Sequence, residues 1–91
     1  MSPTDAAIHD RILGMVAARG VDKTCCPSEI ARALANDDGW RELMPRVRRI
    51  AVELARQERL CITQGGVRIE PQDAEHLAGP IRLGWPASGQ G

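Results

Sequence analysis

The stretch "WRELMPRVRRIA", residues 40–51, places a proline inside an apparent helix and puts three arginines among the next four residues. Apolar residues from here to position 54 recur at the spacing of one buried helix face: Leu43, Val47, Ile50 and Leu54. A proline in a helix interior costs about 3 kcal/mol. This cost disappears if the helix begins at Pro45, so the pattern predicts a separate turn over 39–43 and a helix over 45–58.

Arginines crowd the first turns of this predicted helix. Arg46, Arg48 and Arg49 would oppose the helix dipole there, because its positive end lies at the N-terminus. Their placement therefore favours a nearby anion. The simpler interpretation is a solvated face whose arginines pair with Glu42 and Glu53. Arg49 and Glu53 have the i, i+4 spacing of a helical ion pair.

The charge of the chain is balanced overall but unevenly distributed. Twelve basic and twelve acidic residues give a formal net charge of zero, which argues against a protein that coats nucleic acid without specificity. Residues 41–60 carry six arginines and three glutamates, a net charge of +3, whereas residues 1–40 carry −2 and residues 61–91 carry −1. Eleven of the twelve basic residues are arginine, which indicates either a GC-rich genome or bidentate recognition of phosphate or guanine.

Length and composition indicate one ordinary globular domain. The chain has 91 residues, of which 43% are hydrophobic and 26% charged. It contains no run of 18 apolar residues, so no membrane span is expected. The opening segment "MSPTDAAIHD" has neither a basic nor an apolar stretch, so we expect no signal peptide and a cytoplasmic location.

Two helices are predicted before the proline. Residues 5–19 have the apolar spacing of a helix, and Gly20 follows as a stop. A short extended segment, residues 21–25, leads to a second helix that begins at Pro27, since proline suits the first helical position. Cys26 would be its capping residue.

A β-hairpin and a last extended segment are predicted after the basic helix. The glycine pair at 65–66 is a two-residue turn signal between two alternating segments, residues 60–64 and 67–69. Pro71 ends the hairpin, and the polar residues after it favour a loop or a brief helical turn. "GPIRLGW", residues 79–85, alternates again and predicts an extended segment. Its apolar residues share one side: Ile81 and Leu83.

This order of elements predicts an α+β fold, a three-helix winged helix-turn-helix with a C-terminal β-hairpin wing. A helix, a short turn and a basic helix follow the helix-turn-helix plan, and a hairpin directly after them corresponds to the wing. The predicted domain covers residues 5–84, with a disordered tail over 85–91. The alternative architecture is a three-helix bundle with an incidental hairpin.

Four motifs resemble those of a small bacterial domain family of unknown function. They are "CPSEIARAL", "WRELMPRVRRIAVELA", "ITQGGVRIEP" and "GPIRL", and the similarity covers about residues 8 to 83. The most specific parts are Trp40 with Arg41, Val47 with Arg48, and the closing "GPIRL". The resemblance implies a winged-helix-like fold and implies no activity.

The predicted fold and charge favour duplex nucleic acid, above all DNA, as the partner. The basic helix would enter the major groove, and the helix that begins at Pro27 would turn its N-terminus toward a phosphate. The hairpin tip would follow the adjacent strand. The predicted nucleic-acid contacts are Ser28, Arg41, Arg46, Arg48, Arg49, Arg56, Gln64 and Arg68.

A protein-interaction module without nucleic-acid binding is the alternative function, and the zero net charge supports it. Trp40, Trp85 and the segment 79–85 would then form an apolar or strand-adding surface. The simpler interpretation is that Trp40 caps the core and that 79–85 packs against its own domain. Arg82 would pair there with an acidic residue: Asp37, Asp38 or Glu42. The sequence identifies no dimerisation helix.

An enzyme is not expected, nor is a cofactor or a metal site. The chain has no glycine-rich phosphate loop, no Ser/His/Asp arrangement and no Cys-x-x-Cys spacing. Cys26, at a helix start, is a candidate redox-sensing thiolate, with Cys25 or Cys61 as its resolving partner if residues 24–25 pair with the hairpin. The simpler interpretation is that the cysteines are small buried hydrophobic residues.

Overall fold

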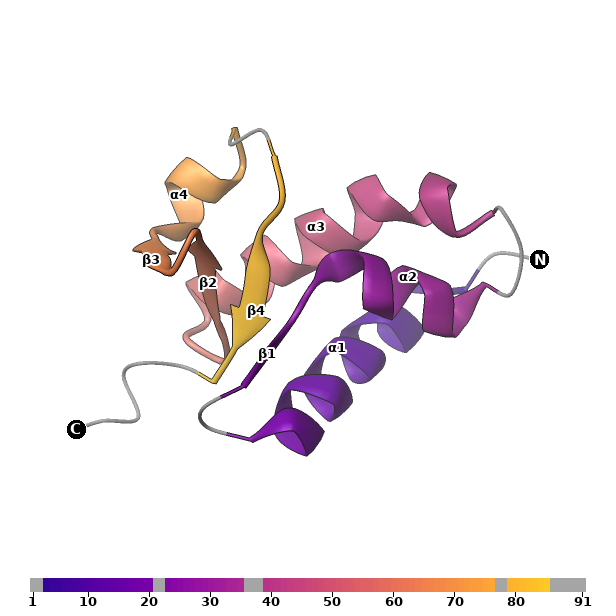
Figure 1. Cartoon of the computed structure of the whole chain (residues 1–91). Helices are drawn as coiled ribbons and strands as arrows, with labels where there is room; N and C mark the ends of the chain where they lie inside the picture. The colour runs from indigo at the N-terminus through magenta and orange to yellow at the C-terminus, as the bar shows by residue number, and fades with distance from the viewer. Residues whose placement is uncertain (1–2, 21–22, 36–38, 77–78, 86–91) are drawn as a thin grey trace.

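The computed structural model of the chain describes residues 3–20, 23–35, 39–76 and 79–85. Its helices are α1 (Asp5–Arg19), α2 (Pro27–Leu34), α3 (Trp40–Arg56) and α4 (Pro71–Ala74), and its strands are β1 (Thr24–Cys25), β2 (Cys61–Gln64), β3 (Val67–Ile69) and β4 (Arg82–Gly84). The fold is α+β, as predicted, with the first three helices packed together and the sheet beside them (Figure 1). None of the helices in these residues is long and apolar enough to cross a bilayer.

Helix α1 begins and ends where the sequence predicts. The side chain of Thr4 caps it by accepting a hydrogen bond of 3.1 Å from the backbone N–H of Ala7. Gly20 ends it with φ +89°, a backbone conformation that glycine adopts without a Cβ clash. The buried residues of α1 form one stripe: Ile8, Ile12 and Val16.

Helix α2 also begins as predicted, with Pro27 at its start and Cys26 as the capping residue. The carboxylate of Glu29 accepts the backbone N–H of Cys26 at 2.9 Å, in a capping box. Glu29 also pairs with Arg19 at the end of α1. These contacts lower the pKa of Glu29, first through the Cys26 N–H and then through Arg19.

Helix α3 begins earlier than predicted, because it runs from Trp40 through Pro45 to Arg56. The predicted start at Pro45 is therefore wrong. Pro45 removes the N–H partner of the Arg41 carbonyl, but this affects one hydrogen bond in the second turn. Leu43, 5% exposed, continues the buried stripe, and Trp40 packs against the same core. Burial of Leu43 alone contributes about 1.5–3 kcal/mol, so tertiary packing offsets the local cost.

The end of α3 lies at Arg56, and Glu58 follows with φ +60°, the one positive φ of a non-glycine residue in the described chain. The N–H of Arg59 reaches back to the Leu54 carbonyl at 3.0 Å. This is the pattern of a left-handed helix terminus, at a position where glycine is preferred.

The four strands form one antiparallel sheet in the order β1-β4-β2-β3 (Figure 1). Strand β4, although last in the chain, pairs with β1 through Leu83 and Cys25 and with β2 through Leu83 and Ile62. These three side chains are buried. Strand β1 thus pairs with β4 and not with the hairpin, so the condition attached to the redox hypothesis is not met. The segment 79–85 packs within its own domain.

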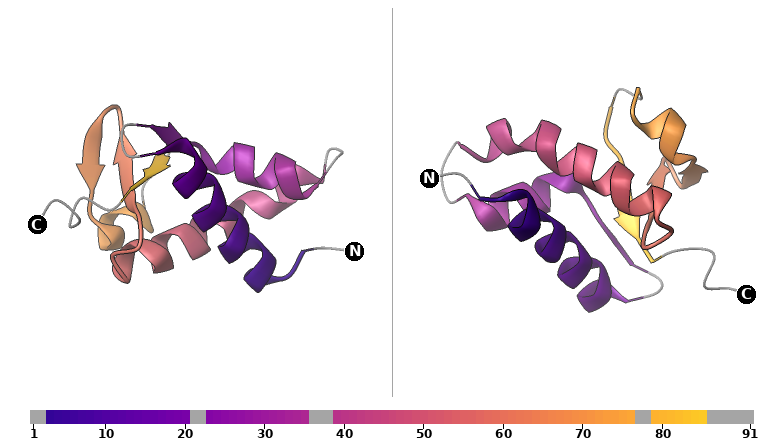
Figure 2. Two further views of the ribbon diagram at one scale, coloured as in Figure 1. Left: turned by 90° about the horizontal axis from the view of Figure 1, so that it is seen from below. Right: turned by 180° about the vertical axis from the view of Figure 1, so that it is seen from behind.

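The hairpin is formed as predicted around Gly65 and Gly66, which both have positive φ. It stands at the end of the molecule away from the start of α3 (Figure 2). The predicted alternation of the last segment also holds, because Ile81 and Leu83 are buried and Arg82 is exposed.

Arg82 bonds to strand β1, and its predicted pairing with Glu42 is absent from the described residues. It donates to the side chain of Thr24 at 2.9 Å and to the Thr24 carbonyl at 3.1 Å. Two other candidate partners, Asp37 and Asp38, lie outside the described residues.

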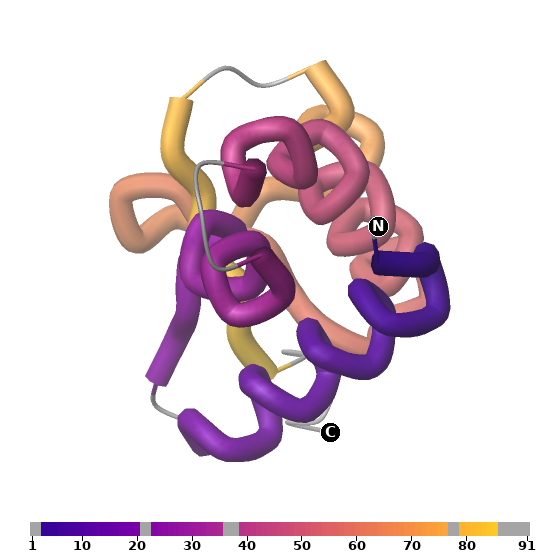
Figure 3. Tube along the Cα trace, turned by 90° about the vertical axis from the view of Figure 1, so that its right-hand side faces the viewer, coloured from indigo at the N-terminus to yellow at the C-terminus, as the bar shows by residue number. Residues whose placement is uncertain are grey.

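The helices and the sheet share one core, so the sheet is no incidental attachment. Buried Leu60 and Ile62 belong to the same apolar cluster as the buried residues of α1, α2 and α3. Seen end-on, the coils of the three helices lie in front of the strands (Figure 3). The arrangement is compatible with a winged-helix-like fold. The β2–β4 connection, residues 65–81, adds β3 and α4 to this arrangement.

Candidate interaction groove on helix α3

Arg46 and Arg49 turn toward the start of α1. Arg46 donates to the Asp5 carboxylate at 2.7 Å and to the Pro3 carbonyl at 2.8 Å, and Arg49 donates to the other Asp5 oxygen at 3.1 Å. The hydrogen bond from Arg46, followed by the charges of both arginines, lowers the pKa of Asp5. These arginines therefore fasten α1 to α3, and Arg49 does not form the expected pair with Glu53.

Arg48 and Arg56 contact the β2–β4 connection. Arg48 donates to the carbonyl of Gly79 at 3.0 Å. Arg56 forms ion pairs with Glu75, just after α4, and with Glu53 at 3.3 Å. Eight residues, about 12 Å of helix, separate the two arginines. They hold the connection over α3 at two points.

Arg41 lies over the ring of Trp40, 5.0 Å from its centroid, and Arg32 of α2 lies 4.4 Å from it. Trp40 is partly buried and packs against the core. The simpler interpretation of Trp40 is thus confirmed. Arg41 covers this tryptophan in a cation–π contact.

The remaining three predicted residues lie on α2, β2 and β3. The hydroxyl of Ser28 is 2.9 Å from the sulfur of Cys26 at the start of α2. Gln64 donates to the Pro80 carbonyl at 3.2 Å. Arg68 is exposed on β3, opposite Thr63 in the register. Most of the eight predicted residues thus already have partners within the domain, and the start of α2 already holds the Glu29 carboxylate.

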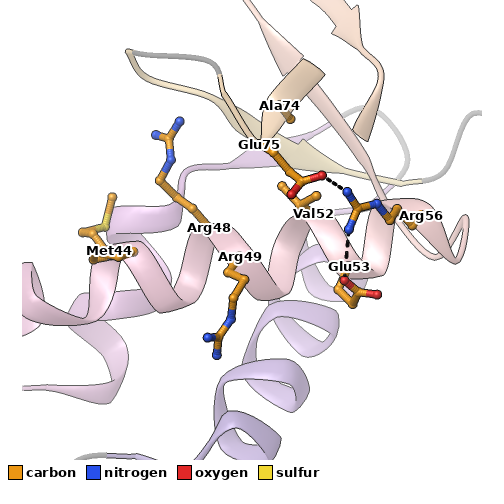
Figure 4. Close-up of a pocket in the computed structure, with 9 residues that line it drawn as sticks. Met44, Arg48, Arg49, Val52, Glu53, Arg56, Ala74 and Glu75 are labelled. Atoms are coloured by element: carbon orange, nitrogen blue, oxygen red, sulfur yellow. Dashed lines mark hydrogen bonds and ion pairs between the residues drawn. The ribbon is translucent and has the colours of Figure 1, made fainter. Parts of the chain in front are cut away.

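A groove of about 440 Å³ lies between α3 and α4 (Figure 4). Its apolar residues are Met44, Pro45, Val52 and Ala74. Its charged residues are Arg48, Arg49, Glu53, Arg56 and Glu75. Arg48 and Arg49 project to opposite sides, and the Arg56–Glu75 pair closes one end (Figure 4). Three of the predicted arginines therefore border a partly apolar depression, and the guanidinium of one of them, Arg49, is turned away toward Asp5.

The apolar part of this groove was missed by the sequence analysis, although a signal was present. On the helical wheel, Pro45 and Val52 fall in the same sector as the arginines. An apolar residue within a basic sector indicates a second covered face. Val52 is 4% exposed, and α4 with Ala74, also 4% exposed, packs on this side of α3.

The cysteines do not support the redox hypothesis. All three are free, and burial raises the pKa of Cys25 to about 11, opposite to the shift that would make it a thiolate. Strand β4 separates β1 from β2 by two strand spacings, about 9.6 Å, which is beyond disulfide reach. Cys61 donates instead to the Trp85 carbonyl at 2.9 Å. The pairing of residues 24–25 with the hairpin, the condition under which Cys61 or Cys25 would resolve Cys26, is therefore absent.

No metal-binding arrangement is found in the part of the chain that the structure describes. No three His, Cys, Asp or Glu side chains are grouped there so that they could hold an ion. Trp85, predicted to belong to the tail, lines a small depression with Leu13, Val16 and Ala17 of α1. Residues 86–91, the rest of that tail, lie outside the described residues.

Comparison with known families agrees with the resemblance of the four motifs. Residues 5–86 match a family model described as "Protein of unknown function (DUF3253)". The chain belongs to this family. A search of curated proteins finds no match. For this DUF3253 domain, a function has to be argued from the surface geometry.

Proposed function

We propose that this DUF3253 domain is a protein-interaction module whose groove between α3 and α4 binds a short acidic and apolar segment of a partner protein. The observation that carries the proposal is the apolar depression bordered by three arginines. A groove of about 440 Å³ is within the size range of specific ligand sites. A few side chains of a peptide would fill it.

The apolar residues of the groove suit a peptide side chain as anchor. Val52 and Ala74 form a preformed floor, and neither has to be exposed further on binding. Met44, partly buried at one end, is flexible and polarizable, so it adapts to side chains of different shape. Burial of an apolar anchor on this floor would supply affinity.

The charged residues favour an acidic partner. Three arginines and two glutamates line the groove, a formal net charge of +1, and one of these arginines, Arg49, has its guanidinium turned toward Asp5 on α1. Arginine binds carboxylates through paired N–H donors. The electrostatic contribution would favour association with acidic segments and would weaken with salt.

Duplex DNA fits this surface less well than a peptide does. A helix that enters the major groove presents a bare face with side chains that reach base edges. Here α4 packs on that side of α3, and Arg48 and Arg56 contact the β2–β4 connection. Arg46 and Arg49 turn away toward Asp5. DNA binding would need these contacts to be exchanged.

The proposal can be tested by selecting peptides from a random display library against the purified domain and measuring their affinity. We expect enrichment of peptides that combine aliphatic and acidic residues. Met44→Glu should weaken their binding about tenfold, because it places a charge on the apolar side. Arg48→Glu should weaken it at low salt. Arg11→Glu is the matched control, since Arg11 is exposed on α1 and does not line the groove.

Two outcomes would contradict the proposal. The first is that no acidic peptide is enriched, or that Arg11→Glu has the effect of Arg48→Glu. The second is tight binding of mixed-sequence duplex DNA at about 50 mM salt. If Arg48→Glu lowered the salt slope of that binding by about one unit, the DNA hypothesis would replace this one.

A further inference from the structure

The groove already contains an acidic group of its own. Glu75, directly after α4, pairs with Arg56, and this pair closes one end of the groove. The side chains are 42% and 41% exposed, so solvent and other anions reach both. The carboxylate of Glu75 thus pairs with the same arginine that an acidic residue of the proposed partner would bind.

Both terminal nitrogens of Arg56 already face a carboxylate of the domain. One terminal nitrogen faces Glu53 and the other faces Glu75. Glu53 lies one turn away on the same helix, so it stays beside Arg56 whatever α4 does. An incoming carboxylate that binds the terminal nitrogen facing Glu75 therefore competes directly with Glu75.

The attachment of α4 makes this exchange feasible. The helix has four residues, too few to be stable alone. Among residues 65–76 and 79–80, Ala74 is the one buried residue. Movement of the Glu75 side chain therefore breaks a half-exposed ion pair and does not itself require Ala74 to leave the core.

We infer that Glu75 is an intramolecular competitor, an autoinhibitory carboxylate that a partner's acidic residue displaces from Arg56. This inference rests on the proposed function of the groove. It makes two statements about selectivity. A partner must carry an acidic residue beside its apolar anchor, and neutralising Glu75 must strengthen its binding.

The test uses a fluorescein-labelled peptide in which leucine and glutamate alternate, with the leucine–glutamine analogue as reference. Fluorescence anisotropy would give Kd for the wild type and for Glu75→Gln. An exposed ion pair accounts for about a two- to fivefold change in affinity, so Glu75→Gln should bind the acidic peptide tighter by that factor. Binding of the glutamine analogue should stay unchanged.

Asp73→Asn is the matched control, because it removes one negative charge from the exposed side of α4. It should change Kd by less than half the effect of Glu75→Gln. In an Arg56→Gln background the gain from Glu75→Gln should vanish, since the competition runs through this one arginine. Thermal unfolding of each variant would show that it is folded.

The outcomes separate this inference from the proposed function. If the acidic peptide binds and Met44→Glu weakens it, but Glu75→Gln behaves like Asp73→Asn, only the competitor is refuted. If Glu75→Gln still tightens binding of the acidic peptide in the Arg56→Gln background, the competitor inference is also refuted, because the change would then be a general effect of charge. Absence of binding to every variant overturns both proposals.

Discussion

Strand β4 and helix α4 are neighbours in the sequence, yet they are attached to the domain by different interactions. Strand β4 lies inside the sheet, where Ile81 and Leu83 are buried. Helix α4 buries Ala74 and is otherwise held by Arg56 and Glu75. Apolar burial is worth several times an exposed ion pair. The part that holds the fold together is thus distinct from the part that is attached mainly by solvated charges.

Substitution of Leu83 is the most direct test of whether apolar burial in β4 holds the fold together. Leu83→Ala should lower the free energy of unfolding by about 2–5 kcal/mol, because it leaves a cavity in the core that the sheet shares with the helices. Urea unfolding at neutral pH would measure it. Val67→Ala on β3 is the control, since Val67 is 64% exposed, and it should change stability by less than about 0.5 kcal/mol. Similar losses in both variants would refute the distinction.

Loss of the capping box of α2, a polar contact within the helical core, should lower the free energy of unfolding by an intermediate amount that depends on pH. Glu29→Ala removes the capping box of α2 and should cost about 1 kcal/mol at neutral pH. The folded-state pKa of Glu29 is below its ordinary value of 4.5, so its contribution is present above 4.5 and is lost as pH falls below it. Wild type should therefore lose more stability than Glu29→Ala between neutral and acidic pH. Parallel pH profiles would contradict this assignment.

At the junction between α3 and β2, a substitution should raise the stability of the domain instead of lowering it. Glu58→Gly should stabilise the domain by about 0.5–1 kcal/mol, because glycine has no Cβ penalty at φ +60°. The Glu58 side chain is exposed, so little contact is lost. Gln57→Gly is the matched control and should destabilise, since φ is −83° there. Thermal unfolding of the pair would show opposite shifts, and equal shifts would refute the strain argument.

The smallest expected change in stability comes from removing the ion pairs that attach α4, and it tests whether α4 and β4 open separately. Arg56→Gln should alter global stability by less than about 0.5 kcal/mol, because the ion pairs of Arg56 are partly solvated. Hydrogen exchange should quicken at Glu75 and His76, whose amides bond within the last turn of the connection. Exchange in β4 should not change. Faster exchange in β4 would mean that α4 and β4 unfold as one unit.

Local patterns predicted most of the secondary structure. Gly20 and Pro27 mark helix boundaries through backbone constraints that act within a few residues, and 65–66 sets the hairpin turn in the same way. The start of α3 could not be predicted so, because the cost of Pro45 is local while the burial of Leu43 that offsets it comes from other helices. The order of the strands in the sheet could not be predicted either, because the alternation of apolar residues indicates a strand without specifying which other strand it pairs with.

The candidate groove was predictable only in part. The arginines of α3 are visible as a basic segment, but their partners are distant in sequence. Asp5 is 41 residues from Arg46, and Gly79 is 31 residues from Arg48. Such pairings depend on how α1 and the β2–β4 connection fold against α3. They turn a surface predicted for nucleic acid into one whose cations largely have intramolecular partners.

The position of β4 has a consequence for biosynthesis. Residues 24–25 leave the ribosome long before residues 82–84, yet β1 pairs with no other strand in the described sheet. The middle of the sheet can therefore close only after nearly the whole domain has been translated. Until then the core that α1, α2 and α3 share lacks Leu83, and a chain stalled before residue 82 would present this uncovered surface to chaperones and proteases.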